Sequence, residues 1–93
     1  MPYIKHAARE KVDTWIFELS NRLPFHDAGV LNYCISRLVI SWLGPDPHYE
    51  DIALATGVLE NVKQELYRRL AGPYEDRKAL ENGDLPGYMS VIE

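Results

Sequence analysis

The chain has 93 residues, of which 46% are hydrophobic, and it carries a formal net charge of -4 at pH 7. This length supports a single hydrophobic core, so we expect one domain over residues 1–93. The acidic balance disfavours nucleic-acid binding, because neutralising phosphates requires a basic face. A domain this small buries only about 60–65% of the surface that its unfolded chain exposes, so its stability is marginal unless something else contributes.

Cys34 is the only cysteine, which excludes an intrachain disulfide and a cysteine-rich zinc site. Association with further copies is the remaining way to add stability, so we expect a homo-oligomer. The longest apolar region, residues 30–43, is interrupted by polar residues and is shorter than the roughly 20 residues of a membrane span. The first residues lack a basic segment followed by an apolar run, so we expect no secretory signal and a cytoplasmic location where Cys34 stays reduced.

The spacing of apolar residues predicts a first helix over residues 7–23, with one apolar arc of roughly 100°. Pro24 ends this helix. Phe17 points away from the arc, which leaves two interpretations. It is either an isolated exposed aromatic residue or a contact between subunits.

A second helix is predicted over residues 28–43, with Asp27 as its N-cap and Gly44 just past its end. Its apolar residues cover an arc of roughly 220°, about twice what a surface helix needs. We therefore expect this helix to be central in the bundle or covered by a second subunit. The apolar residues are Val30, Leu31, Cys34, Ile35, Leu38, Val39, Ile40, Trp42 and Leu43.

A third helix is predicted over residues 50–71 and a short fourth one over residues 74–82, separated by a stop at Gly72-Pro73. Gly57 lies inside the third helix at a cost of about 1 kcal/mol relative to alanine. Either a close neighbouring backbone requires this glycine or the helix simply tolerates it. Residues 84–93 are expected to be extended and to pack back on the bundle or on a neighbour. The sequence thus predicts an all-α fold, a small bundle of three amphipathic helices with a short C-terminal helix and an extended tail.

The residues that usually carry catalysis are not arranged for it. The three histidines lack the helical spacing that places two metal ligands on one face. Cys34 lies within an apolar arc, where a thiol is an inert small hydrophobe rather than a nucleophile. We therefore expect no catalytic residue, no metal site and no cofactor, and a protein that is not an enzyme.

Arginine and tyrosine residues are the more informative polar side chains. Tyr33 and Arg37 are four residues apart on the narrow face that the apolar arc leaves free, so we expect them to lie side by side. Arg69 falls at the edge of the apolar stripe of the third helix and is expected to pair with a carboxylate. The candidate carboxylates are Glu65, Glu75 and Asp76.

Three interpretations of these residues stay open. In the first, Arg69 and its carboxylate form a structural ion-pair network at the turn between the last two helices. In the second, an arginine holds a phosphate or carboxylate while a tyrosine stacks on a flat ring, as in nucleotide recognition. In the third, the same surface docks a protein. The arginines concerned are Arg37, Arg68 and Arg69, and the tyrosines are Tyr33 and Tyr74.

Several segments carry distinctive motifs, namely the N-terminal MPYIK, a central LNYxIxRL, and the C-terminal YRRLxGPYEDxK followed by ENGD. Together these segments resemble a family of short uncharacterised proteins from bacteriophages and metagenomes. The resemblance covers most of the chain and implies a phage-type accessory protein with no assigned activity. It also implies that certain polar residues outside the core belong to a recurring pattern. These are Tyr3, Tyr33, Arg37, Arg69, Tyr74, Glu75, Asp76 and Lys78.

Two hypotheses of function follow. In the leading one, the protein is a non-enzymatic accessory protein that self-associates through its second helix and binds a protein partner such as a host protein. In the alternative, an oligomer sequesters a small phosphorylated ligand such as a nucleotide signal. Nucleic-acid binding is a third and weaker class. The candidate ligand-binding residues are Tyr3, Tyr33, Arg37, Arg68, Arg69 and Tyr74.

Overall fold

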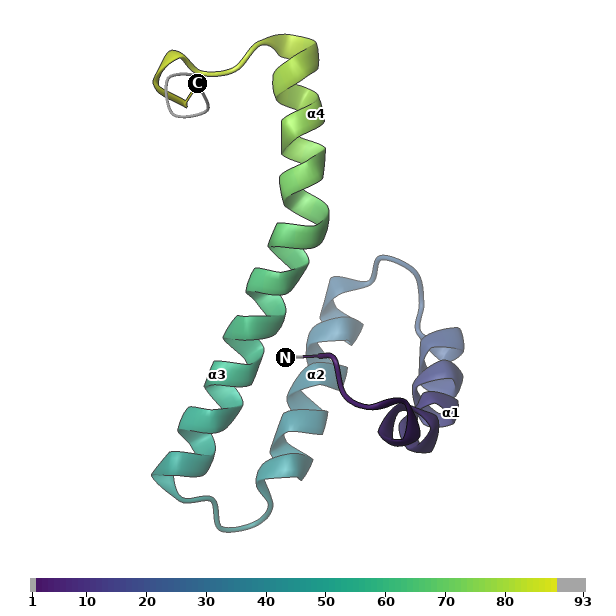
Figure 1. Ribbon diagram of the computed structural model, residues 1–93. Helices are drawn as coiled ribbons and strands as arrows, with labels where there is room; N and C mark the ends of the chain where they lie inside the picture. Colours follow the sequence, from purple (N-terminus) through teal and green to yellow (C-terminus); the bar gives the residue numbers. More distant parts are fainter. Residues whose placement is uncertain (1, 89–93) are drawn as a thin grey trace. The chain divides into compact units, whose positions relative to one another are not determined.

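The computed structural model describes residues 2–88, and these residues are helical wherever they form regular structure (Figure 1). This confirms the predicted all-α class. In chain order, the elements are α1 (His6–Arg22), α2 (Ala28–Leu43), α3 (Tyr49–Leu66), a π-helical turn η1 (Tyr67–Ala71) and α4 (Gly72–Asn82).

The chain divides into two compact units. Unit 1, within Met1–Val58, contains α1, α2 and the first part of α3. Unit 2, within Leu59–Glu93, contains the rest of α3, η1 and α4. That the whole chain forms a single helical domain stays a prediction.

The limits of α2 follow from local capping. The Asp27 carboxylate accepts a hydrogen bond from the Val30 N–H at 3.0 Å, as its predicted role of N-cap requires. At the other end Gly44 has a φ of 79°, which a glycine adopts without strain, and its N–H donates to the Ile40 carbonyl at 3.2 Å. Short-range chemistry therefore sets both ends of this helix.

The start of α3 is capped by its own first turn. The Asp51 carboxylate accepts a hydrogen bond from the His48 N–H at 3.0 Å, and the Ile52 N–H donates to the His48 carbonyl at 3.2 Å. Asp51 also places a negative charge at the positive end of the helix dipole. The helix begins at Tyr49, close to the predicted start.

The predicted stop at Gly72-Pro73 is wrong, because the helix continues from α3 through η1 into α4. The Gly72 N–H donates to the Tyr67 carbonyl, five residues earlier, in place of the usual four. Pro73 stands in the first turn of α4, where its missing N–H is tolerated. One wider turn therefore accommodates the proline without ending the helix.

The expectation of an extended tail is wrong for its described part. Residues 86–88 are helical, and the Tyr88 N–H donates to the Leu85 carbonyl at 3.0 Å. Leu85 and Tyr88 are exposed and so are not buried against the bundle. That this segment packs on a neighbour stays a prediction. The other apolar residues of the predicted tail, Met89, Val91 and Ile92, lie outside the described residues.

Burial is slight throughout the described residues. Ala55, at 6% exposure, is the one buried hydrophobic residue among them, and no residue of α1 or α2 is buried. The surroundings of Gly57 are also open, because a Cβ added at this glycine would meet no described atom within 4 Å. The interpretation that a close backbone requires this glycine is therefore wrong. No described helix is both long enough and apolar enough to span a membrane.

Candidate functional site

Tyr33 and Arg37 lie side by side on α2, as their spacing predicts. The Arg37 Nη1 donates a hydrogen bond to the Tyr33 hydroxyl at 2.7 Å, and the guanidinium carbon lies 5.6 Å from the centre of the tyrosine ring. Both side chains are solvent-exposed. This arrangement holds the guanidinium in a fixed direction while leaving other N–H donors available to a ligand or partner.

A second polar arrangement spans the π-helical turn in unit 2. The Tyr67 hydroxyl donates a hydrogen bond of 2.6 Å to the Glu75 Oε1, eight residues further along the chain. This hydrogen bond, and next the negative charge of Glu75, raises the pKa of Tyr67 above its ordinary value of 10.0. The contact, here called the Tyr67–Glu75 bridge, links η1 to α4.

The ion pairs around the turn differ from the prediction for Arg69. Glu65 pairs with Arg68 at 2.7 Å, and Glu75 accepts the tyrosine hydroxyl. Within the described residues, neither Arg69 nor Asp76 makes a hydrogen bond or an ion pair. The predicted Arg69 network is therefore wrong, because neighbours take up two of its three candidate carboxylates and the third, Asp76, does not reach it.

Basic residues surround Tyr74 on α4. The Arg77 guanidinium carbon lies 5.9 Å from the ring centre and the Lys78 Nζ lies 5.7 Å from it. Lys78 is also held by Glu81 at 3.2 Å. The ring of Tyr74 is thus flanked by two cations, which favours contact with acidic groups over a neutral flat ligand.

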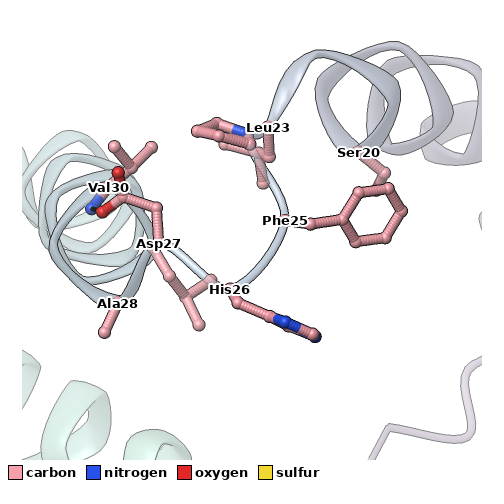
Figure 2. A pocket seen from close by; sticks show the side chains of 9 residues that line it. Ser20, Leu23, Phe25, His26, Asp27, Ala28 and Val30 are labelled. Atoms are coloured by element: carbon pink, nitrogen blue, oxygen red, sulfur yellow. Dashed lines mark hydrogen bonds between the residues drawn. The ribbon is translucent and has the colours of Figure 1, made fainter.

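An open pocket lies at the connection between α1 and α2, within unit 1. Its volume is about 380 Å³, and Figure 2 shows Phe25 on the side of Ser20 while Val30 and Asp27 lie on the α2 side. Phe25 is 96% exposed, and His26 next to it has a φ of 61°, an uncommon conformation for a residue with a Cβ. The lining is mostly apolar, so the pocket suits an apolar side chain more than a charged ligand.

None of the predicted site residues lines this pocket. The pattern of helices gave no sign of it, because the pocket depends on the path of a short connection. The one available signal was a bulky aromatic residue, Phe25, directly after the helix-ending Pro24.

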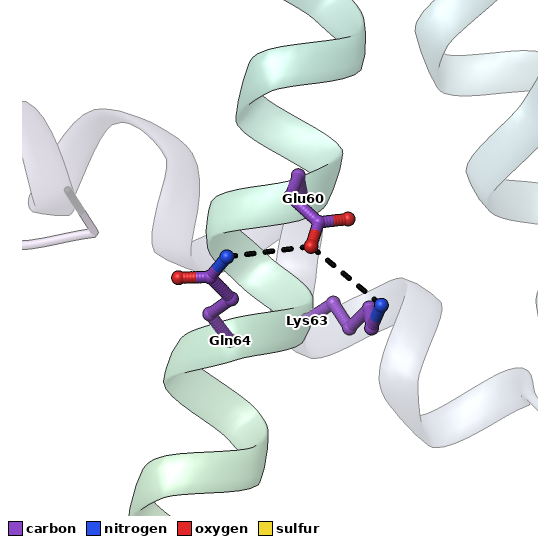
Figure 3. A network of polar contacts seen from close by, with 3 residues as sticks. All are labelled: Glu60, Lys63 and Gln64. Carbon is purple, nitrogen blue, oxygen red and sulfur yellow. Dashed lines mark hydrogen bonds and ion pairs between the residues drawn. The ribbon is translucent and has the colours of Figure 1, made fainter.

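A polar network of three side chains also lies on the part of α3 that belongs to unit 2. Figure 3 shows Glu60 accepting a hydrogen bond from the Gln64 Nε2 at 3.3 Å and lying 3.6 Å from the Lys63 Nζ. All three side chains are exposed. Pairs of this kind contribute only a few tenths of a kcal/mol to a helix.

The predicted ligand-binding residues fall into two groups. Tyr3, Tyr33 and Arg37 belong to unit 1, whereas Arg68, Arg69 and Tyr74 belong to unit 2. Near the second group, the residue that sequence reasoning missed is Arg77, whose guanidinium flanks the ring of Tyr74. No group of three or more histidine, cysteine or acidic side chains suited to a metal ion is found in residues 2–88.

The contribution of the Tyr67–Glu75 bridge to stability is expected to depend on pH. Because the folded-state pKa of Tyr67 is raised, the bridge stabilises the folded chain at pH values below 10.0 and is lost as the pH rises through the raised pKa. Replacing Tyr67 by phenylalanine should remove the last tyrosine to ionise in an ultraviolet titration of tyrosinate. The same change at the exposed Tyr49 is the control, and loss of the late step there instead would contradict the assignment.

No curated protein and no solved structure matches the chain. Residues 1–85 match the family described as Domain of unknown function (DUF6899). Since the match covers most of the sequence, the chain belongs to the DUF6899 family, which carries no assigned activity.

Proposed function

We propose that this protein is a non-enzymatic, cytoplasmic accessory protein of phage type that self-associates through α2 and acts by binding a protein partner. The resemblance of its N-terminal, central and C-terminal segments to short phage proteins supports the assignment of type. The apolar surface of α2 supports the assignment of mechanism.

The observation that carries the proposal is the exposure of α2. Its apolar residues occupy most of its circumference, yet none of them is buried. Burying one such side chain contributes about 1.5–3 kcal/mol, and contiguous exposed apolar patches mark interaction sites. The large exposed members are Leu31, Ile35, Leu38, Ile40 and Trp42.

Two further residues are suited to contact a protein partner. Phe17 on α1 is 67% exposed, and Arg37 on α2 is held in place by Tyr33. Aromatic residues and arginines dominate the energetics of many protein interfaces, particularly when their geometry is fixed before binding.

A pull-down from host lysate tests the partner-binding role. Variants with Phe17→Ala or Arg37→Ala should fold normally but retain at least tenfold less partner, whereas Thr14→Ala, another exposed position on α1, should retain the normal amount. Circular dichroism checks that each variant is folded. Unchanged capture by both test variants would remove these residues from the interface, and absence of any specific partner would contradict the proposal.

The alternative, sequestration of a small phosphorylated ligand, is favoured by a different observation. Arg69 has no partner among the described residues, and Arg37 is already oriented by a tyrosine ring. Each guanidinium can donate hydrogen bonds to the oxygens of a phosphate. Native mass spectrometry of protein purified from cells would show a retained ligand together with the oligomer mass, whereas a ligand-free mass and no thermal shift with nucleotides would exclude this role.

A further inference from the structure

Unit 2 carries an apolar face that runs without interruption through the π-helical turn. Successive members of this face are three, four, four and four residues apart. An α-helix advances about 100° per residue, so each step of four residues overshoots a full turn by about 40°. Three such steps would rotate the face by roughly 120° on a regular helix. The face consists of Leu59, Val62, Leu66, Leu70 and Tyr74.

The π-helical turn removes most of this rotation, because it contains one more residue per turn than an α-helix would. The Tyr67–Glu75 bridge is direct support for the change of phase. Two residues eight apart would lie about 80° from one another around a regular α-helix, yet here their side-chain oxygens are 2.6 Å apart. Leu66, Leu70 and Tyr74 therefore share one side of the helix.

This side is uncovered. The exposed fractions of its five residues range from 40% at Leu59 to 64% at Leu70. Side chains of this size and exposure offer roughly 500 Å² of surface together. A standard protein interface uses about 800 Å² on each partner, so contact through this face alone would be of the small, weak class.

The charged residues along the two edges of the face change sign from one end to the other. One edge carries Lys63 and, further along, Glu75. The opposite edge carries Glu65 and, further along, Arg69 and Arg77. When a second copy of the helix runs in the opposite direction, each edge lies against the same edge of the second copy, with the order of its residues reversed. Opposite charges then face one another.

We propose that unit 2 pairs antiparallel with unit 2 of a second copy, centred on Leu70. In this register Lys63 lies near Glu75 of the second copy and Glu65 lies near Arg77 of the second copy. Leu66 lies opposite Tyr74 of the second copy. Two-fold symmetry repeats each contact, so one surface provides both halves of the interface.

On the edge with Lys63 and Glu75, the local contacts within one chain leave room for this pairing, whereas Glu65 on the other edge already pairs with Arg68. The Lys63 side chain is 73% exposed, and its contact to Glu60 is long at 3.6 Å. Glu75 uses one carboxylate oxygen for the bridge, and a carboxylate can accept further hydrogen bonds on the other oxygen. The inference rests on the proposed function in one respect, namely that the protein self-associates. It assigns to self-association a second surface in addition to that of α2.

A charge exchange tests the pairing by sedimentation of the full chain at about 100 μM, a concentration suited to a small interface. Lys63→Glu and Glu75→Lys should each weaken association about tenfold, and the double variant should recover it. Within one chain these residues are twelve positions apart and make no contact, so recovery would report an intermolecular pair. Glu75→Lys and the double variant both lack the Tyr67–Glu75 bridge, so a difference in association between these two variants does not come from loss of the bridge. Failure of the double variant to recover association would overturn the proposal.

Cross-linking locates the contact independently. On a Cys34→Ser background, Leu70→Cys should form a disulfide-linked dimer on mild oxidation, because the two copies of this position meet at the two-fold axis. Gln64→Cys, on the opposite side of the helix, is the matched control and should remain largely unlinked. Equal linking at the two positions, or none at Leu70, would overturn the pairing. If association persists in that case, the proposed function stands without it; a chain that remains monomeric at every concentration would contradict both.

Discussion

Replacing both Leu38 and Trp42 with aspartate is expected to abolish self-association. These side chains lie one turn apart on α2 and are 60% and 62% exposed, so the change removes little packing within the chain itself. If they are buried between copies, their loss costs about 3 kcal/mol or more, which weakens association by about 100-fold or more. Sedimentation equilibrium measures this directly.

The control adds the same two charges to the same helix at the same spacing. Asn32→Asp together with Ser36→Asp alters exposed polar residues that share a hydrogen bond of 3.3 Å. Association of this variant should remain within a few fold of the original protein. Loss of association in both variants would indicate a general effect of charge, and unchanged association in the first would contradict the role of α2.

Replacing Pro73 with alanine is expected to turn the π-helical turn into regular α-helix. Alanine restores the N–H that proline lacks, so the hydrogen bonds of α3 can continue into α4 with the usual spacing. Because the first turn of α4 already tolerates the missing N–H, the free energy of unfolding should rise by only about 1 kcal/mol. At the same time Tyr67 and Glu75 should move apart around the helix, so the late ionisation of Tyr67 should disappear.

These two effects have opposite consequences and are measured separately. Thermal unfolding reports the gain in stability, and tyrosinate absorbance reports the loss of the Tyr67–Glu75 bridge. Pro45→Ala, in the connection between α2 and α3, is the control and should leave the ionisation of Tyr67 unchanged. A Pro73→Ala variant that keeps the late ionisation would show that the proline does not determine the turn.

Features set by a few neighbouring residues could be predicted from the sequence. Asp27 as an N-cap and Gly44 as a stop depend on the chemistry of one helix end. The contact of Tyr33 with Arg37 depends only on helical spacing. In each case no distant part of the chain is needed.

The outcome at Gly72-Pro73 depends on more than the residues of one helix end. A glycine followed by a proline usually ends a helix, and that signal took precedence over the spacing of apolar residues on both sides. The steps of four residues through Leu66 and Leu70 required a wider turn, which is also what the proline permits. Combining the two signals would have predicted continuation.

The polar contacts near this turn could not be predicted because they depend on its geometry. Glu65 was assigned to Arg69 from spacing alone, but it pairs with Arg68. The Tyr67–Glu75 bridge requires the extra residue of the π-helical turn, and the spacing of eight has no meaning on a regular helix. Once the π-helical turn has rotated the residues that follow it around the helix axis, their side chains meet different neighbours.

The π-helical turn also bears on how much the length of the chain can vary here. A relative that lacked Ala71 would form a regular α-helix through this region, and seven residues of such a helix return to nearly the same side. Leu66 would still align with Tyr74, and Tyr67 would still align with Glu75. Deletion of one residue would therefore keep both alignments but would place Pro73 inside a regular helix, where a proline costs about 3 kcal/mol. The deletion is tolerated at this point only when the proline is replaced as well.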